Sequence, residues 1–374
     1  MSKPVKIGFV GYGRSARTFH LPFLVNNPNF EVYAFYQRSA PPTGADSAAQ
    51  GSHCTVDYPK AKHYQDLDKF LADPEIELVS VVTRHDTHAQ FAEKALLAGK
   101  HVVVEKPFTL SSKDADKVIA ASKKTGKIVS CFQSRRYDSD MQTLIKIHAS
   151  KCLGEITEAE IHYDLDLPFW VKGMTDPHLK PEDGMNFGIG CHSLDQALFL
   201  FGRPKSITAF YRTLRGVESA AEDTFTMILQ YDNSPLIVHV KTHVRTTMRY
   251  PLKYFIRGND GTFIKFGDDR QEDQIVNENM KPGDPGFGVE PEDMWGELTT
   301  RKQYADSQTK KGELWIGKIK SEVSSIGNYY DDVARAIHGE IDLVVKPETS
   351  RDGIRLIELA RQSAEQGVTI PFEG

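Results

Sequence analysis

A short apolar strand followed at once by a glycine-rich turn constrains the fold of this chain more than any other feature. Residues 6–10 lead directly into Gly11-Tyr12-Gly13-Arg14-Ser15-Ala16, and the next segment is apolar enough to form a helix that packs on a sheet. In such a unit the first glycine allows a tight turn, the second lets a pyrophosphate approach the backbone, and the small sixth residue allows close packing. The start of the helix favours phosphate. A glycine turn without a ligand is the alternative.

Strand and helix patterns then alternate as far as residue 132. Apolar runs at 30–36, 77–82, 100–104 and 127–132 are typical of buried strands, and segments 67–71, 89–97 and 112–124 of helices. This alternation predicts a doubly wound parallel sheet, the Rossmann arrangement, and we assign it to a domain spanning residues 1–134.

The residues after the second strand bear on the choice of cofactor. A site for NAD has an acidic residue here for the ribose 2′-hydroxyl, whereas this chain has Gln37-Arg38-Ser39. An amide, a guanidinium and a hydroxyl suit a 2′-phosphate, so Arg38 and Ser39 favour NADP. Use of both nucleotides stays open, as does a solvated Arg38 with no ligand.

The apolar run at 100–104 ends in Glu105-Lys106-Pro107. Proline leaves the hydrogen-bond ladder and fixes φ, so the strand must stop there. Ligands of open α/β sheets bind outside the carboxyl ends of the strands, which makes Lys106 a candidate for chemistry. The alternative is a surface lysine at the end of a strand.

Neither the histidines nor the cysteines of the sequence indicate a metal centre. His85 and His88 are three residues apart without a third ligand nearby, which favours capping or packing. The four cysteines, Cys54, Cys131, Cys152 and Cys191, form no CxxC pair and are interpreted as buried reduced thiols of a cytosolic protein.

From residue 135 onward the pattern changes to strands with few helices. Residues 158–167 alternate between apolar and polar side chains, with Tyr163 on the apolar face, as in a half-buried antiparallel strand. Further strands are predicted at 206–212, 223–231, 236–244, 252–257 and 262–266, with a hairpin turn at 258–261. We assign 135–374 to an α+β domain with an open, mostly antiparallel sheet.

A helix in this second domain carries the other candidate for chemistry. His192 and Asp195 share a face of the segment that follows Gly190. Imidazole exchanges protons near neutral pH, and oxidation of an alcohol by hydride transfer needs a base for the hydroxyl proton. The alternative is a histidine and an aspartate that cap a buried helix.

Composition excludes several classes of protein. The hydrophobic content of 40%, charged content of 26% and net charge of -5 are those of a soluble globular protein without a nucleic-acid footprint. No apolar run reaches the length of a membrane span, and residues 1–6 lack the apolar core of a signal peptide. We therefore expect a cytoplasmic protein that contacts neither membranes nor nucleic acids.

Over nearly its whole length the chain resembles the glucose-fructose oxidoreductase / inositol dehydrogenase / rhizopine catabolism (Gfo/Idh/MocA) family. The matching segments are Gly11-Tyr12-Gly13 with Phe19-His20-Leu21-Pro22, Asp86-Thr87-His88, Ala98-Gly99-Lys100-His101-Val102 running into Glu105-Lys106-Pro107, Gln133 with Arg135-Arg136, and Gly190-Cys191-His192-Ser193-Leu194-Asp195-Gln196. The later Gly283-Asp284-Pro285-Gly286-Phe287-Gly288 is most similar to the branch containing NADP-dependent scyllo-inositol dehydrogenases.

The resemblance implies an active site between a Rossmann domain and an open-sheet domain, and a sugar or cyclitol substrate. A homo-oligomer through the second sheet is expected because an open sheet with one uncovered face commonly pairs with a copy of itself. Lys106 would contact the substrate hydroxyl and the nicotinamide, and His192 would act as acid and base. Substrate-binding residues would be Asp195, Gln133 and Tyr163. Cofactor-binding residues would be Gly11, Tyr12, Gly13, Arg14, Ser15, Arg38, Ser39, Thr83, His85, His88, Glu105 and Lys106, and no metal site is predicted.

Three positions depart from the family pattern. The family usually has an aspartate four residues before the histidine, where this chain has Gly188. Thr83-Arg84-His85 replaces the usual Thr-Pro-Asn, and Asp166 stands where relatives of this branch often have arginine. A histidine without its carboxylate partner loses control of its tautomer and some basicity. An NADP-dependent oxidoreductase is therefore the first hypothesis, and a non-catalytic nucleotide-binding sensor of the same fold is the second.

Overall fold

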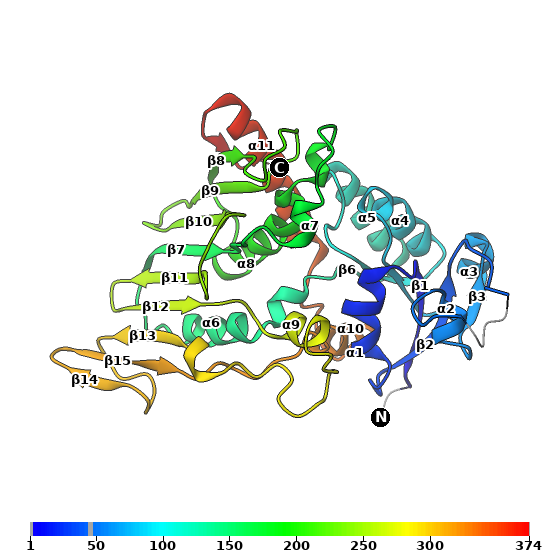
Figure 1. Cartoon of the computed structure of the whole chain (residues 1–374), viewed down its shortest axis with the longest axis horizontal. Helices are drawn as coiled ribbons and strands as arrows, with labels where there is room; N and C mark the ends of the chain where they lie inside the picture. Colours follow the sequence, from blue (N-terminus) through cyan, green and yellow to red (C-terminus); the bar gives the residue numbers. More distant parts are fainter. Residues whose placement is uncertain (1–2, 44–47, 374) are drawn as a thin grey trace. The chain divides into compact units, whose positions relative to one another are not determined.

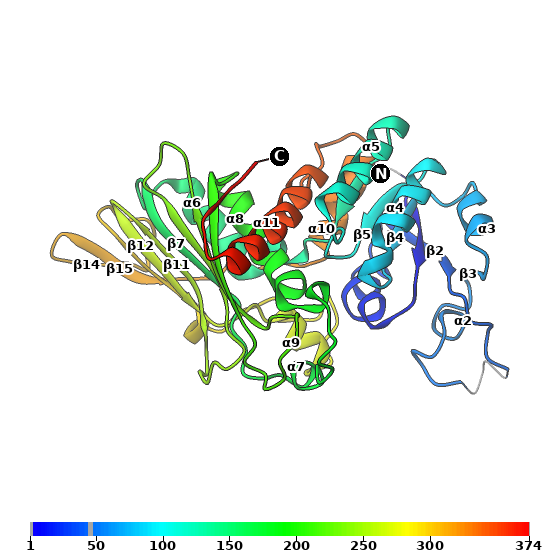
Figure 2. The same ribbon diagram turned by 90° about the horizontal axis from the view of Figure 1, so that it is seen from above.

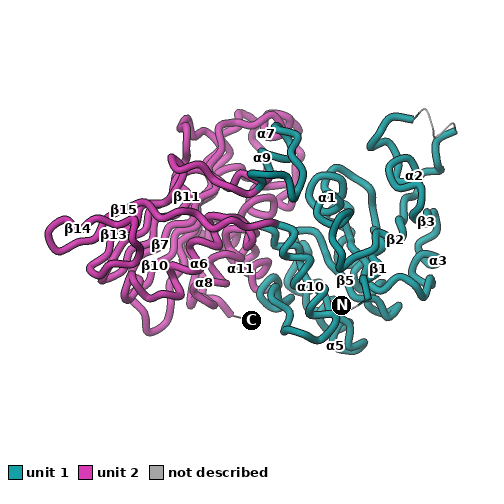
Figure 3. Tube along the Cα trace, turned by 90° about the horizontal axis from the view of Figure 1, so that it is seen from below, with its two compact units in different colours: residues 1–134, 272–287, 326–351 teal, residues 135–271, 288–325, 352–374 magenta. Residues whose placement is uncertain are grey.

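The computed structural model describes residues 3–43 and 48–373. Its contacts divide the chain into two compact units (Figure 3), each built from several segments. Unit 1 comprises residues 1–134, 272–287 and 326–351, and unit 2 comprises residues 135–271, 288–325 and 352–374. No helix within the described ranges combines the length and the apolar character needed to cross a membrane.

Unit 1 contains a six-stranded parallel sheet in the order β3-β2-β1-β4-β5-β6 (Figure 1). Its strands are β1 (Val5–Val10), β2 (Phe30–Tyr36), β3 (Lys62–Tyr64), β4 (Leu78–Val81), β5 (His101–Val104) and β6 (Val129–Cys131). Its helices are η1 (Ala16–His20), α1 (Leu21–Leu24), α2 (Cys54–Asp57), α3 (Leu67–Ala72), η3 (His85–Thr87), α4 (His88–Leu97), α5 (Ser112–Thr125) and α10 (Asn328–Ile337). This strand order is that of the doubly wound dinucleotide-binding fold, so the predicted fold class of the first half is confirmed.

The long apolar strands of unit 1 were predictable because they are buried on both faces. All residues of β4 are buried, as are three of the four in β5, so each reads as an apolar run. The edge strand β3 is half exposed and only three residues long, and it was missed with the neighbouring helix α2. Short exposed elements leave no periodic apolar signal.

Unit 2 contains a ten-stranded, mostly antiparallel sheet in the order β14-β15-β13-β12-β11-β7-β10-β9-β8-β16, in which β7 and β10 pair in parallel. Its strands are β7 (Ile156–His162), β8 (Ser206–Arg212), β9 (Thr224–Gln230), β10 (Ile237–Thr242), β11 (Leu252–Gly258), β12 (Gly261–Phe266), β13 (Gly296–Thr300), β14 (Thr309–Lys311), β15 (Leu314–Ile319) and β16 (Ile370–Pro371). Its helices include α6 (Ser139–Ser150), α7 (Phe169–Lys172), η5 (Pro181–Asp183), η6 (Asn186–Gly190), α8 (Cys191–Phe201) and η7 (Glu292–Met294). The predicted open, mostly antiparallel sheet is confirmed.

Helices cover one face of this sheet. Figure 2 shows α8 on one side of the strands, and α8 contacts β7 and β10. The helix α11 (Pro347–Gln366) is tied to β8 by a hydrogen bond from the Ala209 N–H to the Ser363 hydroxyl. Exposed apolar side chains, Phe210, Ile237 and Phe266, lie on β8, β10 and β12.

Strand β7 is shorter than the predicted strand at 158–167. Ala159 and Ile161 are fully buried as predicted, but the regular strand ends at His162. Asp166 then makes an isolated bridge with Arg245, and Leu167 has a positive φ of 41° before Pro168. Backbone hydrogen bonds nevertheless continue from Tyr163, Leu165 and Leu167 to residues 241–244, so the predicted strand stays paired there without regular strand geometry.

Two late segments of the chain pack with unit 1, although the sequence placed the whole of 135–374 in one domain. The fully buried ring of Tyr330 lies edge-on to Phe30 and to His20, and Phe132 contacts Tyr329. Phe287 contacts Phe23 of α1. The chain therefore returns to complete the core of the parallel sheet.

Candidate active site

The turn after β1 has the backbone geometry that a bound pyrophosphate requires. Gly11 has a φ of 105°, and a Cβ at this position would lie 2.4 Å from the carbonyl oxygen of Val82, so only glycine fits. A Cβ at the exposed Gly13 would have no protein atom within 4 Å. The first glycine therefore packs the turn against β4, and the second leaves room for a ligand.

Two side chains of the turn, those of Tyr12 and Ser15, form hydrogen bonds that hold the turn in place. The Tyr12 hydroxyl donates to Asp57, and burial together with this bond raises the pKa of Tyr12 far above its usual value. The Ser15 hydroxyl donates to Glu105, whereas Arg14 is exposed. Tyr12 and Ser15 thus hold the loop through side-chain bonds to Asp57 and Glu105.

The loop after β2 presents a cation to solvent. The Gln37 amide donates to the Ser39 hydroxyl over 2.9 Å and accepts from the Cys54 N–H over 3.1 Å, which orders the loop. Arg38 is exposed, and among the described residues its guanidinium makes no hydrogen bond or ion pair. An uncommitted guanidinium in an ordered loop is suited to bind an added phosphate group.

The carboxyl end of β5 is fixed by a buried carboxylate. Glu105 accepts from the Ser15 hydroxyl and from the Lys106 N–H over 2.5 Å, and it lies 3.4 Å from His20 Nε2. Burial alone would raise the pKa of Glu105, but the bond and charge of His20, with Lys106 and Ser15, outweigh it and hold that pKa at about 2. The ionised carboxylate fixes the backbone at Lys106, whose bond to Pro107 is cis.

A pair of side chains that the sequence analysis did not select supports Glu105. His20 is fully buried, and its Nδ1 lies 2.5 Å from the Tyr330 hydroxyl, so the imidazole bridges the tyrosine and the carboxylate. His20 lies in one of the segments that resemble the family, and this was the one indication of its importance in the sequence. Tyr330 is 310 residues away in sequence and gave no local signal.

His88 ties two strand ends together. Its Nδ1 lies 2.7 Å from the Pro107 carbonyl oxygen and its Nε2 3.1 Å from that of Thr83, and burial lowers its pKa. The sequence analysis favoured capping or packing for His88, and these contacts agree with packing. The Thr83 hydroxyl bonds to Thr87 over 2.7 Å, and His85 lies half-buried on η3.

In unit 2, the π-helical segment η6 ends directly before helix α8, which carries His192. The Glu222 carboxylate accepts from the Asn186 N–H over 2.9 Å and pairs with Arg361 at 2.5 Å. Burial raises the pKa of Glu222, and Arg361 opposes this effect. A Cβ at Gly190 would lie 2.3 Å from Asn186 Oδ1 and 3.1 Å from the Phe225 ring, so a larger residue there would displace the Asn186 side chain. π-Helical turns of this kind occur frequently at functional sites.

Helix α8 is then anchored one turn beyond the buried His192. Asp195 accepts two bonds from Arg136, from Nε over 2.6 Å and from Nη2 over 2.7 Å, and both side chains are buried. The neighbouring Gln196 donates to the Arg135 carbonyl over 3.2 Å. Asp195 was predicted to contact substrate, but both of its oxygens are engaged by Arg136, a residue not selected from the sequence. The pair positions the helix that carries His192.

The remaining predicted substrate residues lie in different units. Tyr163 follows β7 in unit 2, where Lys253 Nζ lies 4.1 Å from the centre of its ring. Gln133 is buried just after β6 in unit 1. Near Lys253 and Lys265 lie buried acids that the sequence did not reveal, and burial raises the pKa of Glu290 to about 7.

The fold defines a class: a protein with a doubly wound dinucleotide-binding unit joined to a second unit, which here carries a buried histidine. Comparison with known proteins gives the family. Residues 5–133 match the oxidoreductase family with an NAD-binding Rossmann fold, and residues 141–264 match the GFO/IDH/MocA C-terminal domain. The chain belongs to the Gfo/Idh/MocA oxidoreductase family, as the resemblance implied.

Relatives extend over nearly the whole chain. The uncharacterized oxidoreductase YhhX of Escherichia coli is 35% identical, covering 92% of this chain and 92% of its own. The scyllo-inositol 2-dehydrogenase (NADP(+)) IolW of Bacillus subtilis is 31% identical, covering 99% and 96%. A solved oxidoreductase from Bacillus cereus has a TM-score of 0.86 at 29% identity, covering 99% of each chain. The chain is therefore an oxidoreductase with an NAD(P)-binding Rossmann unit.

Proposed function

We propose that this protein is an NADP-dependent dehydrogenase or reductase that acts on a CH–OH carbon of a sugar or cyclitol. The observation that carries the proposal is the buried Glu105 carboxylate, which holds Lys106 at the carboxyl end of β5. Ligands of doubly wound sheets bind at that edge. The room left at Gly13 fits a dinucleotide at the same edge.

The proposed roles follow from the chemistry of the two side chains. When bound, the nicotinamide supplies the hydride acceptor or donor. The Lys106 ammonium would bind the reacting oxygen of the substrate and stabilise the negative charge that develops on it. His192 would take the hydroxyl proton during oxidation and return it during reduction. Asp195 and Arg136 would keep His192 in position.

The choice of NADP rests on the loop after β2. Arg38 is exposed beside the ordered Gln37–Ser39 pair, and the three residues directly after β2, Gln37-Arg38-Ser39, include no acid to bind a free 2′-hydroxyl. The name of the relative IolW includes both NADP(+) and scyllo-inositol. A cyclitol is accordingly the first substrate to test.

A nucleotide-binding sensor without turnover is the second candidate, and Gly188 favours it. This glycine stands one helical turn before His192, where the family usually has an aspartate. A Cβ there would meet only Met185 Sδ, at 4.0 Å, so the position has room for the first side-chain atom that an aspartate would add. Without an orienting carboxylate the imidazole is a weaker base.

We also propose that the protein forms a homo-oligomer through the sheet of unit 2. Phe210, Ile237 and Phe266 are each at least 41% exposed on three strands of that sheet. Association with a second copy would remove these apolar surfaces from water. Sedimentation analysis of wild type and of Phe210→Ser should show a weaker oligomer for the variant, and a monomeric wild type would contradict the proposal.

The decisive experiment follows the absorbance of reduced cofactor. Purified protein is mixed with NADP or NAD and a panel of inositols and aldoses, and with NADPH or NADH and the corresponding ketones and lactones. Turnover with at least one inositol or sugar, faster with NADP, is expected. Micromolar nucleotide binding without turnover on any compound would replace the enzyme with the sensor.

A further inference from the structure

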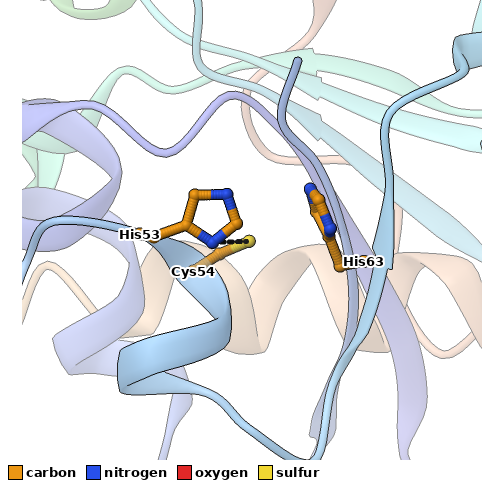
Figure 4. A group of neighbouring side chains, drawn as sticks. All are labelled: His53, Cys54 and His63. Atoms are coloured by element: carbon orange, nitrogen blue, oxygen red, sulfur yellow. Dashed lines mark hydrogen bonds between the residues drawn. The ribbon is translucent and has the colours of Figure 1, made fainter. Parts of the chain in front are cut away.

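We propose that His53, Cys54 and His63 form a binding site for a thiophilic divalent cation, with Zn²⁺ as the ion of best fit. This cluster lies in unit 1, where His53 caps helix α2, Cys54 begins it and His63 lies on β3 (Figure 4). It runs against the sequence analysis, which predicted no metal site. None of the three residues has a part in the proposed oxidoreductase chemistry.

The side chains have the spacing of a metal site. Each residue offers one ligand atom, and these atoms all lie within 4.8 Å of one another. His53 Nδ1 lies 3.9 Å from Cys54 Sγ, and the two imidazole rings are nearly perpendicular, with centroids 4.8 Å apart. Tetrahedral Zn²⁺ with bonds of about 2.3 Å to sulfur and about 2.0 Å to nitrogen places its ligands roughly 3.5 Å apart. Small side-chain rotations would close the cluster around an ion.

Both histidines are already oriented as metal-bound histidines are. His53 Nε2 lies 3.2 Å from the Ser39 carbonyl oxygen, and His63 Nε2 lies 2.9 Å from that of Gln37. A carbonyl acceptor places the ring proton on Nε2 and leaves the lone pair on Nδ1. Metal-bound histidines commonly donate their second ring N–H to a backbone carbonyl.

Burial and ligand type favour zinc. His53 and Cys54 are 3% and 1% exposed, so an ion there would be shielded from water on their side. One thiolate and two imidazoles suit Zn²⁺, whereas Mg²⁺ and Ca²⁺ prefer oxygen. Three protein ligands leave a fourth position for water. Binding replaces the Cys54 thiol proton, which leaves to solvent.

Metal binding would compete with the existing contacts between His53 Nδ1 and Thr55. His53 Nδ1 now accepts from the Thr55 N–H over 3.3 Å and lies 2.9 Å from the Thr55 hydroxyl. The 3.3 Å bond is long, and its N–H stands in the first turn of a helix, where water can replace the acceptor. The exchange therefore replaces this long cap and the 2.9 Å bond with the Thr55 hydroxyl, which can rotate to another partner, by a coordinate bond.

The test measures retained metal. Full-length protein is stripped with a chelator, equilibrated with Zn²⁺, dialysed against metal-free buffer and analysed by mass spectrometry for zinc. We expect one ion per chain in wild type and in the control Cys152→Ser, whose thiol lies in unit 2. Cys54→Ser and His63→Asn should weaken binding by about 100-fold or more. Co²⁺ in place of zinc should show tetrahedral d–d bands and a thiolate charge-transfer band that Cys54→Ser lacks.

Three outcomes would overturn the proposal: no zinc retained by wild type, equal retention by Cys54→Ser, or a cobalt spectrum without the thiolate band. Circular dichroism of the metal-free variants checks that they fold. Should Cys54→Ser fail to fold, His63→Asn decides, because His63 is half-buried at a sheet edge, and full zinc retention by that folded variant would refute the site. None of these measurements requires turnover, so they are independent of the proposed reaction.

Discussion

The two units hold their candidate catalytic side chains in different ways. In unit 1, Lys106 follows a buried strand, and the adjacent Glu105 fixes its backbone N–H directly. In unit 2, His192 lies on helix α8. The ion pairs of Asp195 with Arg136 and of Glu222 with Arg361 hold this helix and the segment before it in place. Lys106 is therefore held by its covalent neighbour, which is itself supported by the distant His20, whereas the helix of His192 is held by ion pairs with residues far away in sequence. Substitution of Lys106 should act on turnover, and disruption of these ion pairs in unit 2 should act through stability.

Removal of the lysine should have the largest effect. Lys106→Ala is expected to lower kcat by about 10²- to 10⁴-fold, because no ammonium stabilises the reacting oxygen, while nucleotide affinity changes little. Steady-state kinetics and nucleotide titration measure the two quantities. Lys113→Ala, which removes a charge from the exposed start of α5, is the control. Unchanged turnover in Lys106→Ala would remove this residue from the mechanism.

Breaking the ion pair between Arg136 and Asp195 should mainly lower the free energy of unfolding. Arg136→Ala leaves a buried carboxylate without its partner, so the free energy of unfolding should fall by about 3–5 kcal/mol. The control Arg301→Ala breaks an exposed pair with Asp260 and should cost less than about 1 kcal/mol. Urea denaturation compares the two. Similar losses for both variants would mean that the buried pair does not anchor α8.

The Glu105 network should appear as a pH dependence of stability. Its folded pKa of about 2 lies below the ordinary 4.5, so its contribution is fully present above about pH 4.5 and is lost as the pH falls toward 2. The difference in unfolding free energy between wild type and Glu105→Gln should narrow on acidification, by about 3 kcal/mol over the whole range. The exposed pair of Glu348 and Lys123 makes Glu348→Gln the control, because water screens such a pair and little pH-dependent difference is expected. A difference that does not vary with pH would contradict the low pKa.

Restoring a carboxylate beside His192 separates the enzyme from the sensor. Gly188→Asp should fit, because a Cβ there has room, and should raise turnover about 10-fold if an orienting acid is what the site lacks. Gly188→Ala, which adds a side chain without a charge, should leave turnover near the wild-type value. Equal rates for the two variants would show that His192 does not depend on a carboxylate at this position.

The smallest effect concerns cofactor choice. Arg38→Ala should weaken NADP binding by about 5- to 10-fold and NAD binding by less than about 2-fold, because only NADP has the 2′-phosphate. Lys69→Ala removes one positive charge elsewhere on the exposed surface of unit 1 and controls for general electrostatics. Fluorescence titration with both nucleotides measures the affinities. Equal weakening of both would mean that Arg38 does not bind the phosphate.

Local patterns were sufficient wherever a feature depends on neighbouring residues. Strands β2 and β8 have the predicted bounds, because alternation and apolar runs are periodic within a few residues. The positive φ of Gly11 was also predictable, since it arises within one turn, whereas the close approach of Gly11 to the Val82 carbonyl oxygen depends on packing against a distant segment. Of the strands that escaped prediction, β3 and β14 are three residues long and contain no buried residue. Strands β13 and β15, of five and six residues, also escaped prediction although Leu298 and Ile319 are buried.

The sequence alone thus determined the fold class, the glycine turn and the positions of Lys106 and His192 at the ends of their elements. Only the tertiary structure decided which buried polar and charged side chains lie next to one another. His20 meets Tyr330 across 310 residues, and Arg136 meets Asp195 across 59. Such pairs depend on how elements pack, and the cost of a buried charge is met only by a specific partner in space. Secondary structure repeats along the chain, whereas a buried ion pair has no sequence period to reveal it.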